Sequence, residues 1–354
     1  MSESWVHIIG AGVSGLSLAA QLAQHQELPG LVKISDPYLD QAKSQTFCFW
    51  FNEEESQWLQ PEKSWSRWQF STTEHQHVHH GQKYKYGMVS GERFRNSALD
   101  TIKSHPQIEL IRERVEQKPT AQHVFDSRPP SIDQFYIKQS FIGFEIEGEH
   151  GYDLEQVALM DDLSFAHGGL RFKYLLPITR NRLLVEYTLF TQEVVNLDEF
   201  EAESRQALTR DCTFSFTHLR LEKAHIPMGL KSSFPSWGMP IGTRAGMSRD
   251  ATGYGFVEMQ RWARRASQQL ISQNYVSPYR GSRLRDWMDT CLLRLIEHRP
   301  ELSPQLFMEL ARFLSGDQFA QFMMRCQFSD AISMMLRAPK RSFFLSAMGK
   351  PQWI

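Results

Sequence analysis

The sequence predicts an α/β protein with a parallel sheet. A second, antiparallel sheet gives it an α+β character, and the chain ends in a helical region. Three observations predict this fold class. A short apolar run from Trp5 to Ile9 meets a glycine-rich turn and a helix-like segment, as in a β–α unit of a parallel sheet. Residues 134–190 alternate apolar and polar side chains between turn residues, which is typical of antiparallel strands. Residues 284–348 have helical patterns rich in Leu, Phe and Met.

The first strand leads into a turn with the spacing of a dinucleotide-binding motif, Gly10-Ala11-Gly12-Val13-Ser14-Gly15. Its first glycine would allow the tight turn, its second the approach of a pyrophosphate, and its third close packing of helix on strand. Val13 and Ser14 open the helix whose N-terminus would face the phosphate charge. Asp36 ends the next strand about twenty residues later, where a carboxylate usually meets ribose hydroxyls. The alternative is an ordinary glycine turn, but the flanking strand and helix favour a cofactor.

The next elements extend this first region. Residues 92–102 carry apolar side chains at helical spacing, with Ser90 as the expected N-cap and Arg93 in the first turn. Residues 108–111 and 124–128 are predicted strands, and the prolines that follow end regular pairing. We place a domain boundary at these prolines. The expected parts are a nucleotide-binding domain (1–130 and 225–275), a β-sheet substrate domain (131–224) and a helical C-terminal region (276–354).

A second glycine-rich segment precedes the strongly helical residues 257–271. If it returns to the nucleotide-binding domain, its free backbone N–H groups would face an electron-rich edge of the cofactor. The residues of this segment that we expect at the cofactor are Gly242, Gly246, Thr252, Gly253 and Tyr254.

One carboxylate of the predicted antiparallel sheet lies among apolar neighbours. In the predicted strand 182–190, Leu184, Glu186 and Thr188 share one face. Desolvation there would raise the pKa of Glu186 and suit it to donate a proton. The alternative is a solvent-facing carboxylate, since strand carboxylates are usually exposed.

Composition and charge exclude several classes of function. The 39 Lys+Arg and 40 Asp+Glu of the 354 residues give a net charge of -1, and no long basic run occurs, so we expect no nucleic acid partner. The 24 Phe, 10 Tyr, 9 Trp and 14 Met indicate a roomy apolar interior or an apolar ligand. The four cysteines form no CxxC motif, which favours free thiols in a reducing compartment: Cys48, Cys212, Cys291 and Cys326.

Two further classes of segment are not expected. The N-terminus lacks the basic start of a signal peptide, and no apolar stretch approaches the roughly eighteen residues that span a bilayer. We therefore expect a cytoplasmic protein, soluble or bound to a membrane surface. His75, His77 and His79 would share a strand face, but no distant Cys or carboxylate pairs with them, so we expect no metal.

The order of motifs resembles one family closely, the FAD-dependent lycopene cyclases, which are bacterial and plant β-cyclases. The resemblance covers nearly the whole chain and implies a Rossmann-like, glutathione-reductase-type FAD-binding domain. It is carried by the GxGxxG turn and by residues 46–50, 124–128, 141–145, 159–161, 172–177, 184–188, 240–242, 252–254 and 336–340.

The resemblance implies a lycopene β-cyclase, an isomerase of the intramolecular lyase class. In that reaction an acid protonates the terminal double bond of an acyclic carotenoid end group. A neighbouring double bond attacks the carbocation, and proton loss leaves a β-ionone ring, so that lycopene becomes γ- or β-carotene. The resemblance also implies FAD in its reduced form, with NAD(P)H as the reductant, although the isomerisation consumes no electrons.

The resemblance assigns roles to particular residues. It matches Glu186, in Leu184-Val185-Glu186-Tyr187-Thr188, to the essential carboxylate of the motif that plant members write as FLEET. It also places acids at Glu145 and Asp161, although alternation puts Glu145 beside Glu147 on a face that looks solvated. It adds Arg93 and Asp126 to the FAD contacts, and Asp126 could equally be structural.

One departure bears on the choice of function. Gly242-Thr243 stands where many flavoproteins of this fold have Gly-Asp, and lycopene cyclases also tend to lack that aspartate. This favours a cyclase over a hydroxylase. Two alternatives stay open: an FAD/NADPH-dependent monooxygenase of related fold, and a homologue that binds FAD or carotenoid without cyclising it.

The implied partners follow from the substrate. A hydrophobic carotenoid dissolves in membranes, so we expect the enzyme to meet a bilayer surface peripherally. The tail with Lys340, Arg341 and residues 343–345 has amphipathic character that suits docking, and a packed terminal helix is the equal alternative. The sequence does not define an oligomeric state.

Overall fold

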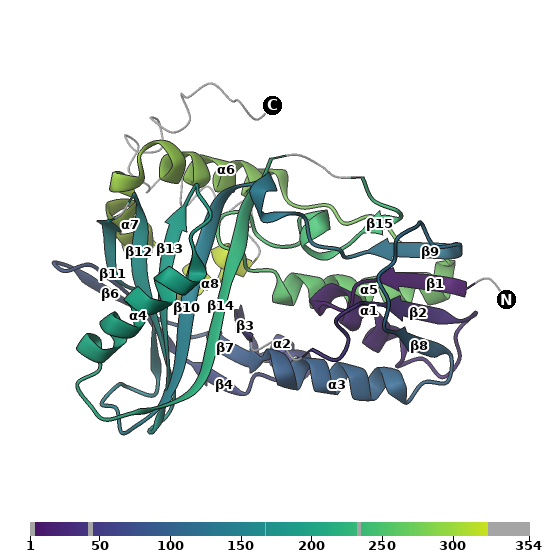
Figure 1. Cartoon of the computed structure of the whole chain (residues 1–354), viewed down its shortest axis with the longest axis horizontal. Helices are drawn as coiled ribbons and strands as arrows, with labels where there is room; N and C mark the ends of the chain where they lie inside the picture. The colour runs from purple at the N-terminus through teal and green to yellow at the C-terminus, as the bar shows by residue number, and fades with distance from the viewer. Residues whose placement is uncertain (1–3, 42–44, 167, 232–234, 325–354) are drawn as a thin grey trace. The chain divides into compact units, whose positions relative to one another are not determined.

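The computed structural model describes residues 4–41, 45–166, 168–231 and 235–324. The chain forms two compact units (Figure 1). Unit 1 comprises Met1–Phe47, Val89–Ser131 and Ser232–Gly281, and unit 2 comprises Cys48–Met88, Ile132–Lys231 and Ser282–Ile354. The predicted α/β class, with a parallel sheet and a separate, largely antiparallel sheet, is confirmed. The predicted helix at 332–336, the amphipathic tail and Cys326 lie outside the described residues.

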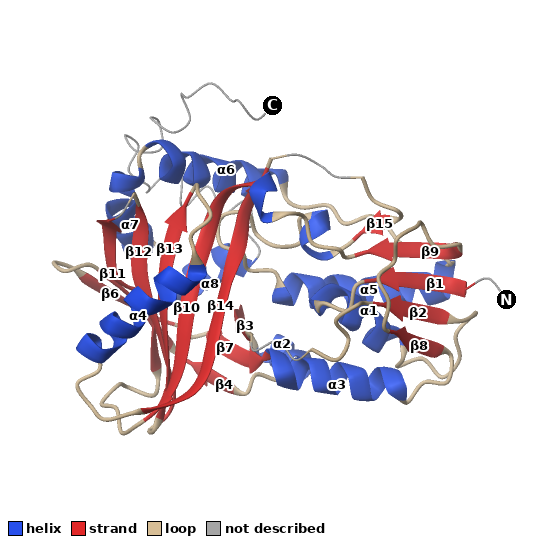
Figure 2. Ribbon diagram, viewed as in Figure 1, coloured by secondary structure: helices blue, strands red, loops and turns tan. Residues whose placement is uncertain are grey.

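Unit 1 contains a five-stranded sheet in the order β15-β9-β1-β2-β8, and every neighbouring pair is parallel (Figure 2). Because parallel strands all point the same way, the ends of β1, β2 and β9 meet at one edge, where ligands of such sheets bind. The strands are β1 (Ser4–Ile9), β2 (Val32–Ser35), β8 (Ile108–Ile111), β9 (Ala121–Asp126) and β15 (Met239–Pro240).

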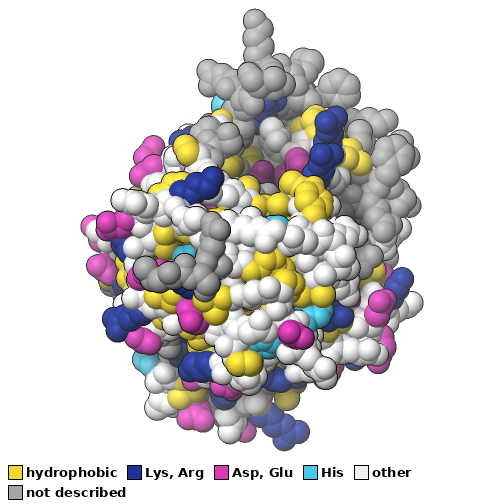
Figure 3. Space-filling view, turned by 90° about the vertical axis from the view of Figure 1, so that its right-hand side faces the viewer, with side chains coloured by type: hydrophobic (Ala, Val, Ile, Leu, Met, Phe, Trp, Pro, Cys, Tyr) yellow, Lys and Arg dark blue, Asp and Glu magenta, His cyan; other side chains and the backbone are white. Residues whose placement is uncertain are grey.

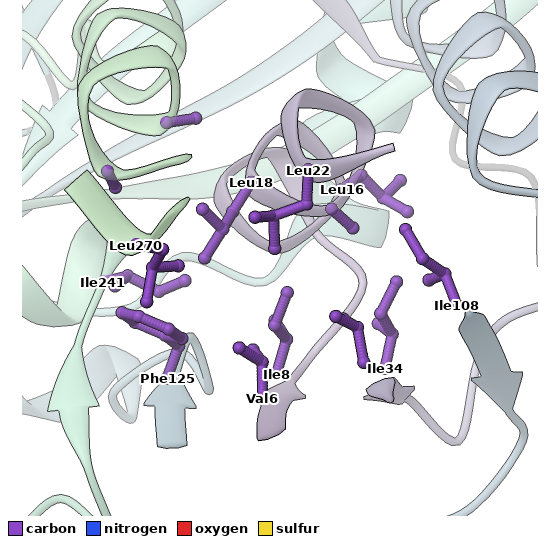
Figure 4. Close-up of a cluster of buried hydrophobic side chains, with 14 of the residues drawn as sticks. Val6, Ile8, Leu16, Leu18, Leu22, Ile34, Ile108, Phe125, Ile241 and Leu270 are labelled. Atoms are coloured by element: carbon purple, nitrogen blue, oxygen red, sulfur yellow. The ribbon is translucent and has the colours of Figure 1, made fainter. Parts of the chain in front are cut away.

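Three helices complete unit 1: α1 (Val13–Leu22), α3 (Gly91–Lys103) and α5 (Phe256–Gln273). Leu16, Leu18 and Leu22 of α1 point toward Val6 and Ile8 of β1 in a fully apolar cluster (Figure 4). Leu270 of α5 belongs to the same cluster. The segment after the second glycine-rich stretch therefore returns to unit 1.

The sequence located the start of α3 correctly. The Ser90 hydroxyl oxygen accepts a hydrogen bond from the backbone N–H of Arg93 at 3.2 Å, which satisfies one of the donors that a helix leaves unpaired at its N-terminus.

Unit 2 is built on a seven-stranded sheet in the order β14-β10-β13-β12-β11-β5-β6. All its pairs are antiparallel except β11 with β5. Residues 135–147 form one long strand, β10. The strands are β5 (Arg67–Ser71), β6 (Gln76–His80), β10 (Phe135–Glu147), β11 (Gln156–Ala166), β12 (Gly169–Thr179), β13 (Arg182–Thr191) and β14 (Thr217–Leu230).

The two faces of this sheet differ. Helix α4 (Leu197–Asp211) covers one face, where its Phe200 and Leu208 pack with Val185, Tyr187 and Leu189 of β13 (Figure 1). We call this the α4 face. Because side chains alternate along a strand, Leu184, Glu186 and Thr188 lie together on the opposite face, as predicted. We call this the Glu186 face.

The remaining elements of unit 2 are a small sheet and several helices. The small sheet has the order β3-β7-β4, and its first two strands begin or end in unit 1. Helices α6 and α7 contact the large sheet. The elements are β3 (Thr46–Phe51), β4 (Lys63–Trp65), β7 (Lys85–Ser90), α2 (Glu53–Leu59), α6 (Arg283–His298), α7 (Ser303–Phe313), α8 (Gly316–Met324) and the 3-10 turns η1 (Ile132–Gln134), η2 (Gly242–Ala245) and η3 (Pro300–Leu302), of which η2 is in unit 1.

The unit boundaries correct the expected ones in two places. Residues 48–88, expected in the nucleotide-binding domain, belong to unit 2, because β5 pairs along β11 of the large sheet. Residues 282–324, expected as part of a separate helical region, also belong to unit 2, because their helices pack on its strands. The break expected at Pro130 lies one residue from the observed end of the second segment of unit 1, Ser131.

Candidate functional site

The glycine-rich turn of unit 1 is shaped by three separate steric demands. Gly10 has a φ of +99°, and a Cβ there would lie 2.4 Å from Ser127 Oγ. A Cβ on Gly15 would lie 2.0 Å from the carbonyl oxygen of Gly10, so the helix can pack this closely only on a glycine. Gly12 is different, because it is exposed and an added Cβ would meet nothing within 4 Å. The space beside Gly12 is open to a ligand.

The end of β2 holds a carboxylate at this turn. Asp36 Oδ2 accepts a hydrogen bond from the backbone N–H of Ala11 at 2.7 Å, and Oδ1 accepts one from Tyr38 N–H at 2.7 Å. Helix α1 begins immediately after Gly12, which has no side chain to cap its first N–H groups. The turn therefore presents helix N–H donors beside an anchored carboxylate, the arrangement that binds a dinucleotide pyrophosphate and ribose.

The two glycine-rich segments meet within unit 1. Gly242 has a φ of +66°, and a Cβ there would lie 2.2 Å from the buried hydroxyl of Ser14. Gly246 and Gly253 also have positive φ, each at 71°. The backbone carbonyl oxygen of Arg249 accepts a hydrogen bond from Gly253 N–H at 2.8 Å, so the segment folds back on itself before α5. Thr252 and Tyr254 lie in this fold-back, half-buried.

The remaining residues expected at the cofactor are placed differently. Arg93 is exposed in the first turn of α3. Asp126 is fully buried at the end of β9, and its carboxylate accepts hydrogen bonds from Arg128 Nε at 2.9 Å and Nη2 at 2.7 Å. Burial alone would raise the pKa of Asp126, but the Arg128 hydrogen bonds and the Arg244 charge outweigh it and hold the pKa below its usual value. The Arg128 guanidinium stacks 3.7 Å from the Trp237 ring. Asp126 thus orders the loop around Arg128.

A row of functional side chains crosses the Glu186 face of unit 2. Glu186 of β13 pairs with Gly143 of β10, which in turn pairs with Glu222 of β14. On the other side, Glu186 pairs with Tyr174 of β12. Directly opposed residues of neighbouring strands project to the same face, so Glu222, Glu186 and Tyr174 lie side by side.

Glu186 is an acid with a strongly shifted protonation equilibrium. It lies deep in unit 2 but keeps some accessible surface. Burial, followed by the charge of Glu222, raises the pKa of Glu186 to about 8, and the hydrogen bond from Thr188 Oγ1 at 3.1 Å only partly opposes them. At neutral pH the carboxyl group therefore carries a proton.

Two tyrosines and a thiol lie next to this acid. The hydroxyls of Tyr174 and Tyr86 are hydrogen-bonded at 2.7 Å, and Cys48 interacts with both. Burial is the main cause that raises the pKa of the Cys48 thiol to about 12, and the charges of Glu186 and Glu222 add to it. Cys48 is thus a neutral thiol, and the side of the row away from Glu222 is polar but uncharged.

Glu145 lies two residues further along β10 on the same face. It is 4% exposed and accepts hydrogen bonds from Arg182 Nε and Arg220 Nε, each at 2.9 Å. The expectation that Glu145 lies on a solvated face was wrong. Its carboxylate is buried, and Arg182 of β13 and Arg220 of β14 neutralise its charge there. Arginine only donates, so Glu145 acts as a hydrogen-bond acceptor.

The structure does not bring Asp161 to Glu186. Asp161 of β11 pairs with Lys173 of β12, which lies on the α4 face next to Tyr187. Its carboxylate accepts a hydrogen bond from Ser71 Oγ at 2.6 Å and lies 3.6 Å from Lys173 Nζ. Lys173 also lies 3.5 Å from Asp211, the last residue of α4. Asp161 belongs to an ion-pair network on the far side of the sheet.

The histidine cluster is placed by packing. His79 of β6 is 2% exposed, and its Nε2 lies 2.6 Å from the carbonyl oxygen of Ala311 in α7. Burial lowers its pKa to about 4. Within the described ranges, no group of three His, Cys, Asp or Glu side chains is arranged to hold a metal ion.

Sequence reasoning missed Glu222, Gly143 and Tyr174 as a set. Glu222 alternates with Leu221 and Lys223 like any carboxylate of a half-exposed strand. Only the pairing of β14 with β10 brings it to Glu186, and that pairing joins residues about eighty positions apart, beyond the reach of local periodicity. The signal that was available is Gly143 itself, because a glycine inside a strand often marks a close approach.

Solved structures with the same fold define the class of protein. A geranylgeranyl bacteriochlorophyll reductase-like protein of Thermoplasma acidophilum matches over 98% of this chain and 99% of its own, with a TM-score of 0.59 and 11% identity. The p-nitrophenol 4-monooxygenase PnpA of Pseudomonas putida matches over 99% of both chains, with a TM-score of 0.53 and 11% identity. The fold is that of FAD-dependent oxidoreductases and monooxygenases.

The family follows from the sequence. The family model described as "Lycopene cyclase protein" matches residues 6–348, and the chain belongs to the lycopene cyclase family. A lycopene beta-cyclase of Paracoccus sp. is 28% identical over 123 residues, 33% of this chain and 32% of that protein. One of Pantoea ananas is 27% identical over 171 residues, 44% of this chain and 43% of that protein. The chain thus matches less than half the length of these relatives.

Surface and membrane features add two observations. Acidic and basic side chains are interspersed over the face drawn in Figure 3, as the balanced composition predicts. Among the helices that the structure describes, none is long and apolar enough to cross a bilayer.

Proposed function

We propose that the protein is a lycopene β-cyclase that converts acyclic carotenoid end groups into β-ionone rings by a redox-neutral, acid-initiated cyclisation. The observation that carries the proposal is Glu186, an acid with a pKa of about 8 on a strand face that it shares with Leu184 and Thr188. An acid that is protonated at neutral pH is what the first step of this reaction needs. Membership of the lycopene cyclase family supports the carotenoid substrate.

The residues of unit 2 divide the chemistry between them. Glu186 would give its proton to the terminal double bond of the carotenoid end group, at its less substituted carbon, and the resulting carboxylate would stand beside the tertiary carbocation. Tyr174 of β12 pairs with Glu186, and an aromatic ring at this position could stabilise a cation. The neighbouring double bond attacks the carbocation, and the cyclised cation then loses a proton to the Glu186 carboxylate, which completes the ring and restores the acid. The bonds and the proton balance without an oxidant.

FAD fits the cradle of unit 1. The open side of Gly12 and the N–H donors that open α1 suit the pyrophosphate, and Asp36 suits the ribose. When bound in its reduced form, with NAD(P)H as the reductant, FAD would supply an electron-rich ring of the kind that stabilises a cation. The FAD contacts that we propose are Gly10, Gly12, Val13, Ser14, Gly15, Asp36, Arg93, Asp126, Gly242, Gly246, Thr252, Gly253 and Tyr254.

The assignment of roles to the units is part of the proposal. We assign FAD binding to unit 1 and substrate binding to the large sheet of unit 2. Because carotenoids dissolve in lipid, we propose that the enzyme works in the cytoplasm, bound peripherally to a membrane surface.

Expression in a lycopene-producing host tests the proposal. The wild-type chain is expected to shift the pigment from lycopene to γ- or β-carotene, and Glu186→Gln to abolish the shift while the protein still binds FAD. Glu147→Gln is the matched control, because Glu147 is an exposed glutamate at the end of the neighbouring strand. An active Glu186→Gln variant would remove Glu186 from the chemistry.

The two alternatives give different results in the same preparation. A monooxygenase would consume oxygen and NADPH in proportion to its product, whereas the cyclase is expected to work without oxygen once FAD is reduced. A homologue that only binds its ligands would return the pigment unchanged after incubation with reduced FAD.

A further inference from the structure

We infer that Glu222 is the second carboxylate of the site: it shares one proton with Glu186 across Gly143 and positions that proton on Glu186. Its importance for cyclisation rests on the proposed function, but the sharing of the proton is a property of the sheet and can be measured without any reaction.

The geometry of the sheet brings the two carboxylates together. Glu186 and Glu222 belong to β13 and β14, the two neighbours of β10, and both pair with Gly143. Two strand spacings separate their backbones by roughly 10 Å. Ordinarily the side chain of the middle strand fills this gap, but Gly143 has none. The Glu222 side chain occupies the space instead, because a Cβ on Gly143 would lie 2.9 Å from Glu222 Cγ.

The surrounding charges decide which of the two holds the proton. Arg220 Nη1 lies 3.6 Å from Glu222 Oε2, on the same strand. The hydrogen bond to Glu186 comes instead from the neutral hydroxyl of Thr188. A negative charge is therefore better stabilised on Glu222, and the proton is better placed on Glu186.

The other titratable groups of this face do not take the proton from Glu186 and Glu222. Arg182 and Arg220 both donate to Glu145. Tyr174, Tyr86 and Cys48 on the far side of Glu186 form an uncharged hydrogen-bonded group. The charge of Glu222 acts on Glu186 in the interior of unit 2, where two interacting carboxyl groups cannot both ionise at low cost, so they titrate as a coupled pair.

The consequence for the proposed reaction is a defined proton donor. Glu222 is 5% exposed and lies behind Gly143, so it is a positioning residue for Glu186. Together with burial, its charge keeps Glu186 protonated at neutral pH. Once Glu186 has delivered its proton, both carboxylates would be ionised, and the extra negative charge would favour the return of a proton to Glu186. Without Glu222, Glu186 would ionise at a lower pH and start the reaction less often.

Infrared titration of the FAD-loaded protein tests the shared proton directly. The Glu186 carboxyl band is obtained as the difference between the wild type and Glu186→Gln across a pH series. Its midpoint is expected to fall by about one pH unit in Glu222→Gln. Glu222→Asp, which keeps the charge, is expected to retain most of the elevation. The exposed control Glu147→Gln is expected to leave the midpoint unchanged.

Two readings keep the inference separate from the proposed function. If the wild type cyclises lycopene, the alkaline limb of its rate profile is expected to move to lower pH by the same amount in Glu222→Gln, with the rate recovered in more acidic buffer. If the wild type does not cyclise lycopene, the proposed function fails, but the infrared midpoint still tests the pair. Should Glu222→Gln fail to fold, Glu222→Leu supplies a second neutral replacement. An unchanged midpoint in a folded neutral variant would overturn the inference.

Discussion

The two faces of the seven-stranded sheet treat their carboxylates in opposite ways. On the α4 face, Asp161 and Asp211 surround Lys173 at 3.6 and 3.5 Å. On the Glu186 face, Glu186 and Glu222 flank a glycine. Neighbouring residues of a strand point to opposite faces, so a shift of one position along β12, from Lys173 to Tyr174, moves from one environment to the other.

This difference shows how one sheet can hold carboxylates that stabilise the fold on one face and a carboxyl group suited to acid catalysis on the other. The α4 face supplies a countercharge, and the pKa of Lys173 is raised because the attraction of the aspartates outweighs burial. On the Glu186 face, burial first and the like charge of Glu222 second raise the pKa of Glu186 to about 8. Paired charges stabilise a fold, whereas a carboxyl group kept protonated can do acid catalysis.

The largest expected effect separates the two faces by activity. Glu186→Gln is expected to reduce cyclisation by at least about 100-fold, because removing a general acid typically costs 10²–10⁴ in rate. Asp161→Asn, on the α4 face, is expected to keep most of the activity. Initial rates of carotene formation with reduced FAD measure both. A loss in Asp161→Asn equal to that in Glu186→Gln, with both proteins folded, would remove the distinction between the faces.

The second effect tests the gap between the two glutamates. Gly143→Ala is expected to lower the cyclisation rate about tenfold. The added methyl group would displace the Glu222 side chain, and Glu186 would then be less well placed and less often protonated as the proton donor. Gly151→Ala is the matched control, since a Cβ there meets nothing within 4 Å. Thermal unfolding of both variants, measured together with the rates, separates displacement of Glu222 from a general loss of stability. Equal rates in both variants would show that Glu222 can move without consequence.

The third effect belongs to the α4 face and concerns stability. Lys173→Met is expected to lower the free energy of unfolding by about 2 kcal/mol, because it removes the cation that Asp161 and Asp211 share, and partial exposure softens the cost. Chemical denaturation measures this change. Arg171→Met, on the same strand, removes the ion pair with Glu203, whose side chain is 47% exposed, and is expected to cost less. The reverse order would contradict the assignment of Lys173 as the centre of the network.

The sequence was sufficient for features that depend on local pattern. The GxGxxG turn, the helix that starts after Ser90 and the alternation that puts Glu186 opposite Tyr187 all follow from residues close together in the chain. Residues 48–88 were misplaced because their strand β5 pairs with β11, about ninety positions away. Asp161 and Glu145 were grouped with Glu186 on motif resemblance alone, and strand register, which sequence does not specify across long connections, put Asp161 on the other face.

A fourth effect is a pH-dependent difference in stability. The pKa of Glu186 is about 8 in the folded protein and near the ordinary glutamate value of 4.5 when unfolded, so between these values the folded state binds more protons. By linkage, the contribution of Glu186 to stability is then lost progressively as pH rises from about 4.5 to about 8. Glu186→Gln removes this loss. The variant is therefore expected to gain stability over the wild type across that window, and to keep a constant difference at higher pH.

Thermal unfolding of both proteins in a pH series measures the curve, which reports Glu186 together with its partner Glu222. Glu147→Gln, on the exposed end of β10, is expected to give no such rise. A difference that stays flat from pH 4.5 to 8 would mean that Glu186 ionises normally, and the contrast between the two faces would then rest on position alone.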